Sequence, residues 1–279
     1  MDFAWRSSIL GLVALALAPL GSSAASRHDE GIGFYIGYDG LPAVASGTYA
    51  GLSNPNLDRL TFLLDHGSHF HGIGTYSYAG PATAPSILST SANNRIPEIS
   101  SNEAPLPLIQ GSGFYAGTLR TDVGSSEHGY LGIASIQSLA GHPPGSMEDI
   151  LFQSSNNRWS GQLNDAEIGL RLVESTPGLH IGRETTKDIY ASGDTFMLMP
   201  GTGSDFEFKP VYWVDDAAPA GVYSATFELL NTASGSSIMN SGAFHFDFAV
   251  SAVPEPGSHA MFLAGLLTLI SITWRRLPC

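Results

Sequence analysis

The feature of this sequence that most restricts its fold is a strict alternation of aromatic and polar residues near the C-terminal end. Phe244, Phe246 and Phe248 alternate with His245 and Asp247. Successive side chains of a β-strand point to opposite faces, so this period of two places the three phenylalanines in a core and the two polar residues on the other face. A helix would distribute the same residues around its axis. The segment is therefore predicted to be a strand with one buried face.

Segments of similar character recur through the chain. They combine alternation, or β-branched and aromatic residues, with Gly, Pro, Asn or Ser at their ends, and they cover residues 33–38, 60–65, 69–78, 114–119, 168–173, 195–199, 206–214, 222–230 and 243–250. Their spacing predicts an all-β fold, a β-sandwich or jelly roll of roughly ten or more strands. The stretch 81–107, rich in Ser, Asn, Ala and Pro, is expected to be a long loop or a crossing between sheets.

The charge balance restricts the partners. The chain carries 12 basic and 25 acidic residues, a formal net charge of −13. Such a surface repels phosphate backbones, so nucleic-acid binding is excluded. It attracts divalent cations only weakly and without selectivity, and solubility is its simpler explanation. The single cysteine, Cys279, cannot form a disulfide within the chain or a cysteine zinc site, so a metal site must use His, Asp or Glu.

The N-terminal end has the pattern of a secretory signal peptide. Arg6 precedes an apolar run at 9–20, and small residues follow at 21–26. Cleavage is expected after Ala25, which makes residues 1–25 the signal peptide. The apolar run is too short to be interpreted first as a membrane-spanning helix.

The C-terminal end combines a motif, a short apolar stretch and a basic stop. The motif comprises Val253, Pro254, Glu255 and Pro256, the apolar stretch runs from 260 to 274, and the stop is Arg275 and Arg276. These parts, in this order, resemble a PEP-CTERM sorting signal covering residues 253–279, with a short transmembrane helix and a basic tail. The resemblance implies an exported protein of a Gram-negative bacterium, processed by signal peptidase and exosortase, at the cell surface or in the extracellular matrix. Residues 26–252 would then form the surface domain, as one domain or two tightly joined sub-domains.

One segment concentrates metal-binding chemistry. His66, His69 and His71 are three of the nine histidines and fall within six residues. In a strand, His69 and His71 point to one face, about 6.5 Å apart at the backbone, while Phe70 points into the core. Gly67 can bend the chain and bring His66 or Asp65 toward the same ion. Imidazole suits Zn, Cu, Ni and Fe, and spacing does not distinguish them; zinc is the default.

A further ligand is expected from a distant strand. His245 shares a strand face with Asp247, and His180 lies in another short apolar segment. A single histidine is more often a hydrogen-bonded or solvated residue than a ligand, and the alternative for the cluster itself is a solvated polar strand face.

A second resemblance extends over most of the mature chain. The phrases that carry it are 69–74, 76–81, 93–98, 154–155, 158–159, 208–213 and 241–244. They are similar to a family of PEP-CTERM proteins whose genes are repressed by the zinc-uptake regulator. The resemblance implies expression under zinc limitation and a role in gathering or holding zinc at the surface, with a metal transporter as a further partner.

The sequence thus predicts a surface protein that binds a divalent metal, most favourably zinc, through a His-rich strand. No motif of a common enzyme class is present. Asp65 and Glu98 could serve as the base of a metal-dependent hydrolase, but the sequence gives no reason to choose them. The chain is therefore predicted not to be an enzyme. The alternatives are a structural matrix protein and a polysaccharide-binding protein in which Trp159 and Trp213 stack on sugars.

Overall fold

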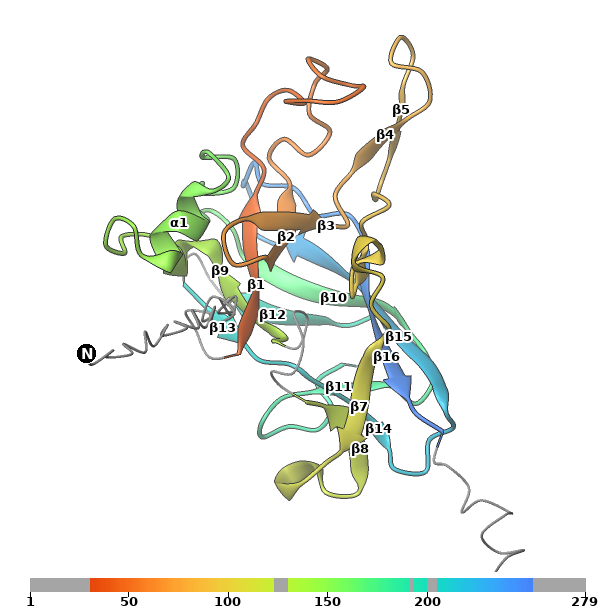
Figure 1. Cartoon of the computed structure of the whole chain (residues 1–279). Helices are drawn as coiled ribbons and strands as arrows, with labels where there is room; N and C mark the ends of the chain where they lie inside the picture. Colours follow the sequence, from red (N-terminus) through yellow and green to blue (C-terminus); the bar gives the residue numbers. More distant parts are fainter. Residues whose placement is uncertain (1–30, 123–129, 191–192, 200–204, 253–279) are drawn as a thin grey trace, which may run out of the picture.

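The computed structural model describes residues 31–122, 130–190, 193–199 and 205–252, and the predicted signal peptide and sorting signal lie outside them (Figure 1). Strands are the main regular secondary structure of these residues. The strands are β1 Ile32–Tyr38, β2 Leu60–Asp65, β3 Phe70–Ile73, β4 Ser77–Ala79, β5 Ser86–Leu88, β6 Arg95–Ile96, β7 Leu106–Gln110, β8 Thr118–Thr121, β9 Gly132–Ser135, β10 Ile168–Ser175, β11 His180–Gly182, β12 Thr195–Met199, β13 Glu207–Phe208, β14 Val211–Asp215, β15 Gly221–Asn231 and β16 Phe244–Val250. The helical elements are α1 Met147–Gln153 and three single 3₁₀ turns, η1 Ile99–Ser101, η2 Gly113–Tyr115 and η3 Ile136–Leu139.

The strands form two large sheets and one separate hairpin. The five-stranded sheet has the order β13-β9-β1-β2-β3. The nine-stranded sheet has the order β11-β14-β8-β7-β16-β15-β10-β12, and β6 pairs with β16 beside this path. β4 and β5 pair only with each other. Their hairpin and the loop after β1 project from the same end of the molecule (Figure 1).

The two large sheets share one core, and its centre is aromatic. Phe244, Phe246 and Phe248 are buried on one face of β16, as the alternation predicts. Phe62 of the five-stranded sheet stacks on Phe244 with ring centroids 4.2 Å apart, and Phe34 meets Phe246 edge to face at 5.5 Å. Offset-stacked and edge-to-face pairs are the favoured aromatic geometries, so this contact fastens one sheet to the other.

The five-stranded sheet is buried on its second face as well. Tyr35, Leu63 and Phe70 point away from the shared core and pack with Leu151 of α1 and with Trp159. These residues belong to a second, smaller core. All six residues of β2 are buried, including the polar Thr61 and Asp65, because the strand is covered on both faces. β1, β2 and the start of β3 are therefore fixed from both sides.

Three expected strands are interrupted. Residues 69–78 divide into β3 and β4 at Gly74, whose φ is +67° and where a Cβ would lie 2.5 Å from the carbonyl oxygen of Ala243. Residues 206–214 divide at Pro210, and the two parts join different sheets. Residues 114–119 begin as the turn η2 and become strand only at Thr118.

The stretch 81–107, expected to be a loop or crossing, carries β5, β6, η1 and the start of β7. It nevertheless connects the separate hairpin to the nine-stranded sheet, in which β6 and β7 both pair in parallel with β16. The pairing of β6 and β7 with β16 places the residues between these two strands beside the nine-stranded sheet.

The all-β class is confirmed. The sandwich or jelly-roll assignment and the division into one domain or two remain predictions. Among the described residues, no helix has the length and hydrophobicity needed to cross a bilayer.

Candidate metal centre

The turn between β2 and β3 places the three clustered histidines. The N–H of His66 donates to the carbonyl oxygen of His69 at 2.9 Å and closes the hairpin. Gly67 has a φ of +82°, a left-handed conformation that favours glycine, and its N–H donates to Oδ1 of the buried Asp65 at 2.5 Å. As predicted, Gly67 bends the chain so that His66 lies beside His69 and His71.

The alternation around Phe70 aims His69 and His71 to the same side. Phe70 is 6% exposed and meets Tyr35 edge to face at 5.7 Å. Because Phe70 is buried against Tyr35 and Trp159, its two chain neighbours, His69 just before β3 and His71 within it, point to the other side. His69 is exposed, and His66 and His71 are half-buried.

The three imidazoles are close enough for one ion. One ring nitrogen from each of His66, His69 and His71 lies within 4.8 Å of the other two. Nε2 of His69 is 3.1 Å from Nε2 of His71. Two nitrogens bound to a tetrahedral zinc at about 2.0–2.1 Å lie about 3.3 Å apart, so this separation is close to the bound value. The rings of His66 and His71 have centroids 4.0 Å apart and tilt by 31°, so the third imidazole lies beside this pair.

The buried carboxylate of Glu98 contacts two of the three histidines. Glu98 is 2% exposed and follows β6. Its two oxygens lie 2.9 and 3.0 Å from Nδ1 of His71, and Oε2 lies 3.0 Å from Nε2 of His66. The side-chain amide of Asn93 donates to Oε1 at 2.7 Å.

Sequence reasoning named Glu98 only as a base for a hydrolase and missed this position. One signal was available, because Glu98 is the only acidic residue between His66 and Asn102. The contact could not be inferred from spacing, since it joins residues 27 and 32 positions apart.

The environment of His69 favours its neutral form. Desolvation, followed by repulsion from His71 and then His66, lowers the pKa of His69 below its ordinary value. A neutral imidazole is the form that can bind a metal ion.

His180 and His245 do not join the group, contrary to expectation. Both lie on strands of the nine-stranded sheet and have other partners. His180 lies 2.9 Å from Asp188 and stacks on Trp213 with centroids 4.3 Å apart. His245 lies 3.9 Å from Asp247 on its own strand. Among the described residues, the one group of three or more metal-binding side chains is His66, His69 and His71.

The two tryptophans expected to stack on sugars are buried. Trp159 and Trp213 are each 8% exposed. Trp159 packs in the second core, and Nε1 of Trp213 donates to the carbonyl oxygen of Lys187 at 2.5 Å. Neither presents a free face on which a sugar ring could stack.

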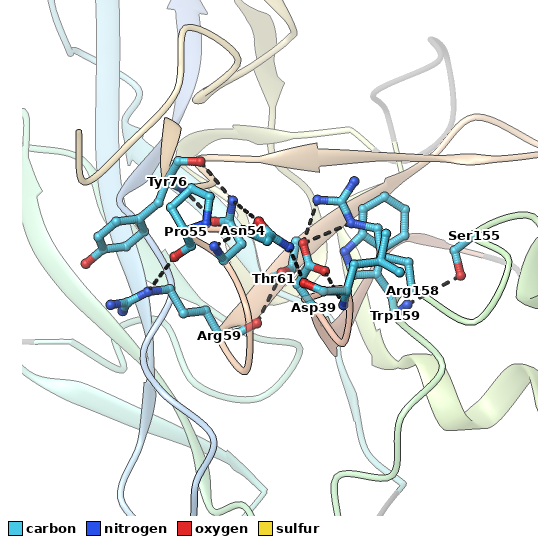
Figure 2. A network of polar contacts seen from close by, with 11 residues as sticks. Asp39, Asn54, Pro55, Arg59, Thr61, Tyr76, Ser155, Arg158 and Trp159 are labelled. Atoms are coloured by element: carbon cyan, nitrogen blue, oxygen red, sulfur yellow. Dashed lines mark hydrogen bonds and ion pairs between the residues drawn. The ribbon is translucent and has the colours of Figure 1, made fainter. Parts of the chain in front are cut away.

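A pocket of about 260 Å³ lies between the loop after β1 and the strand β4, with Tyr49, Tyr76 and Tyr78 in its wall. Two of its polar side chains, Arg158 and Asn56, form hydrogen bonds within the protein (Figure 2). Arg158 donates to the fully buried Asp39 through Nε at 2.9 Å and Nη2 at 2.5 Å. Asn56 donates to the carbonyl of Tyr76 at 2.8 Å and accepts from its N–H at 2.7 Å. This network fixes the projecting loops.

The cluster of His66, His69 and His71 can therefore hold a metal ion, and it is supported by a buried carboxylate. Comparison with protein-family models, with curated protein sequences and with solved structures finds no match to this chain.

Proposed function

We propose that this chain is an exported cell-surface protein that binds a divalent metal ion, most favourably zinc, at His66, His69 and His71. The observation that carries the proposal is the convergence of three imidazole nitrogens within 4.8 Å on one short hairpin. Two core anchors, Phe70 and the buried β2, hold that hairpin in place, so little order must be gained when the ion binds.

Zinc is preferred by the chemistry of the donors. The three protein ligands are nitrogens, and Zn²⁺ binds imidazole in tetrahedral geometry at distances that match the 3.1 Å between the Nε2 atoms of His69 and His71. Calcium and magnesium require oxygen ligands and are disfavoured. Copper and nickel share the affinity for imidazole, and availability in the environment decides among these ions.

The ends of the chain support a location outside the cytoplasm. The signal peptide at 1–25 and the PEP-CTERM signal at 253–279 remain predictions from the sequence, because both lie outside the described residues. In that setting the site serves scavenging or storage of zinc at the cell surface under zinc limitation. A partly exposed site next to a hairpin turn suits this role, since an ion can enter and leave without opening the core.

Calorimetric titration of the full-length protein with zinc tests the proposal. We expect one site in the wild type and its loss in the double variant His69→Ala/His71→Ala. The matched control is His180→Ala/His245→Ala, which removes the same number of histidines elsewhere and is expected to bind as the wild type does. Equal, weak binding by all three proteins would show that the acidic surface alone attracts the ion and would overturn the proposal.

A further inference from the structure

We infer that Glu98 is the positioning residue of the metal centre: its carboxylate accepts a hydrogen bond from Nδ1 of His71 and so directs Nε2 of that ring to the ion. This inference rests on the proposed function and deepens it, because it assigns a role to a residue outside the three-nitrogen group.

The contact geometry assigns the two nitrogens of His71 to different partners. Nδ1 lies 2.9 and 3.0 Å from the two oxygens of Glu98. Nε2 lies 3.1 Å from Nε2 of His69. A carboxylate accepts hydrogen bonds and does not donate them, so the proton of a neutral His71 ring belongs on Nδ1. The lone pair on Nε2 then faces Nε2 of His69. An ion bound by both rings must lie between these two nitrogens.

The carboxylate is itself held in place. Glu98 is 2% exposed, and the amide of Asn93 donates to its Oε1 at 2.7 Å. A buried carboxylate requires such partners, because an unpaired buried charge is costly. Oε2 also lies 3.0 Å from Nε2 of His66, so one carboxylate orients two of the three rings.

Glu98 also connects the centre to the second sheet. It follows β6, whose Ile96 pairs with Phe246 of β16 in the nine-stranded sheet. The histidines belong to the hairpin β2–β3 of the five-stranded sheet. The orientation of His71 therefore depends on the docking of both sheets. The negative charge of Glu98 also offsets part of the charge that a divalent ion brings to the three neutral rings.

The test compares two variants that remove one negative charge each, Glu98→Gln at the centre and Glu174→Gln on an exposed part of β10. Zinc affinity of the full-length protein is measured by competition with a chromophoric chelator. We expect Glu98→Gln to bind zinc about 10–100-fold more weakly than the wild type, the effect typical of such outer partners of ligating histidines, and Glu174→Gln to be unchanged. Equal affinity of Glu98→Gln and wild type overturns the inference and leaves the proposed function standing. Absence of a zinc site in the wild type overturns the proposed function first.

A spectroscopic measurement on the metal-free wild type does not depend on the folding of a variant. With ¹⁵N-labelled histidine rings, long-range ¹H–¹⁵N correlation spectra at pH 8 report which nitrogen of each ring carries the proton. We expect His71 to carry it on Nδ1 in the wild type and to lose this preference in Glu98→Gln. A proton on Nε2 of His71 in the wild type overturns the inference, even if Glu98→Gln fails to fold.

Discussion

The three histidines of the centre are not equivalent, and His71 has the most connected position. Its Nδ1 contacts Glu98, its Nε2 faces His69, and its ring lies 4.0 Å from that of His66. We expect His71→Ala to weaken zinc binding by more than about 100-fold, beyond the range for loss of an outer partner, because it removes a ligand and separates Glu98 from the ion. Chelator competition measures the loss. The control His180→Ala is expected to retain wild-type affinity, and an effect as large as that of His71→Ala there would contradict the placement of the site.

The lowered pKa of His69 predicts a pH dependence for the metal-free protein. Since the folded-state pKa lies below that of the unfolded chain, the unfolded chain takes up the proton more readily. The contribution of His69 to stability is therefore present above about pH 6.5, the ordinary value, and is lost as the pH falls through the folded pKa. Urea unfolding in the presence of a chelator, at pH 7.5 and 5.5, should show a smaller loss of stability for His69→Ala than for wild type. The difference should be small because His69 is exposed.

At this scale the sequence predicted which histidines cluster, but not the carboxylate that contacts them. His66, His69 and His71 could be found because strand alternation and one glycine bring near neighbours together. Glu98 could not be found in the same way, since its approach depends on how β6 docks on β16. The sequence could not show that His180 and His245 lie outside this group of three, because short segments of strand do not reveal which sheet they join.

At the scale of elements, the geometry of the hairpin β2–β3, which carries the three histidines, depends on Gly67. A Cβ at this position would meet no atom within 4 Å, so a substitution there acts through the backbone, whose φ is +82°. We expect Gly67→Ala to destabilise the protein by about 1–2 kcal/mol, the cost of a left-handed conformation for an L-residue, and to weaken zinc binding as the turn shifts. Denaturant unfolding and zinc titration measure both effects. Gly67→Asn should be milder, because asparagine tolerates this region; an equal loss in both variants would contradict the backbone explanation.

The strand β16 supplies the contact between the sheets, and Phe246 is its most central ring. Phe246 meets Phe34 at 5.5 Å, Tyr212 at 5.4 Å and Phe62 at 5.9 Å. We expect Phe246→Ala to lower the free energy of unfolding by about 3–5 kcal/mol, because it leaves a cavity between tightly packed rings. The control Val222→Ala, at a residue 56% exposed on the neighbouring strand, should change stability by less than about 0.5 kcal/mol. A similar loss in both variants would contradict the position of the core.

Elements with a regular pattern were predictable from the sequence, and those defined by tertiary contacts were not. The alternation in β16 and the apolar residues of β2 predicted the positions of these strands within a residue or two. The break at Gly74 follows from its close approach to Ala243, a contact between residues 169 positions apart. The break at Pro210 was signalled by the missing N–H of proline, but the clean alternation before it favoured a continuous strand.

For the whole molecule, the shared core determines whether the described residues unfold as one unit. Phe34 and Phe62 of the five-stranded sheet pack against Phe244 and Phe246 of the nine-stranded sheet, so neither sheet keeps its core when the other unfolds. We expect one cooperative thermal transition, with the calorimetric enthalpy equal to the van't Hoff enthalpy. Two resolved transitions would instead support two sub-domains.

Zinc should move this same transition, because the centre draws its parts from both sheets. The histidines stand on the hairpin of the five-stranded sheet, and Glu98 follows a strand paired to the nine-stranded one. An ion that binds only the folded protein stabilises it by about 2.7 kcal/mol at a free concentration 100 times its dissociation constant. Scanning calorimetry with and without zinc should therefore show the whole transition shifted upward in the wild type, and less so in Glu98→Gln at the same zinc concentration. If zinc sharpened or shifted only part of the transition, the centre would belong to one sheet alone, and Glu98 could not join the two.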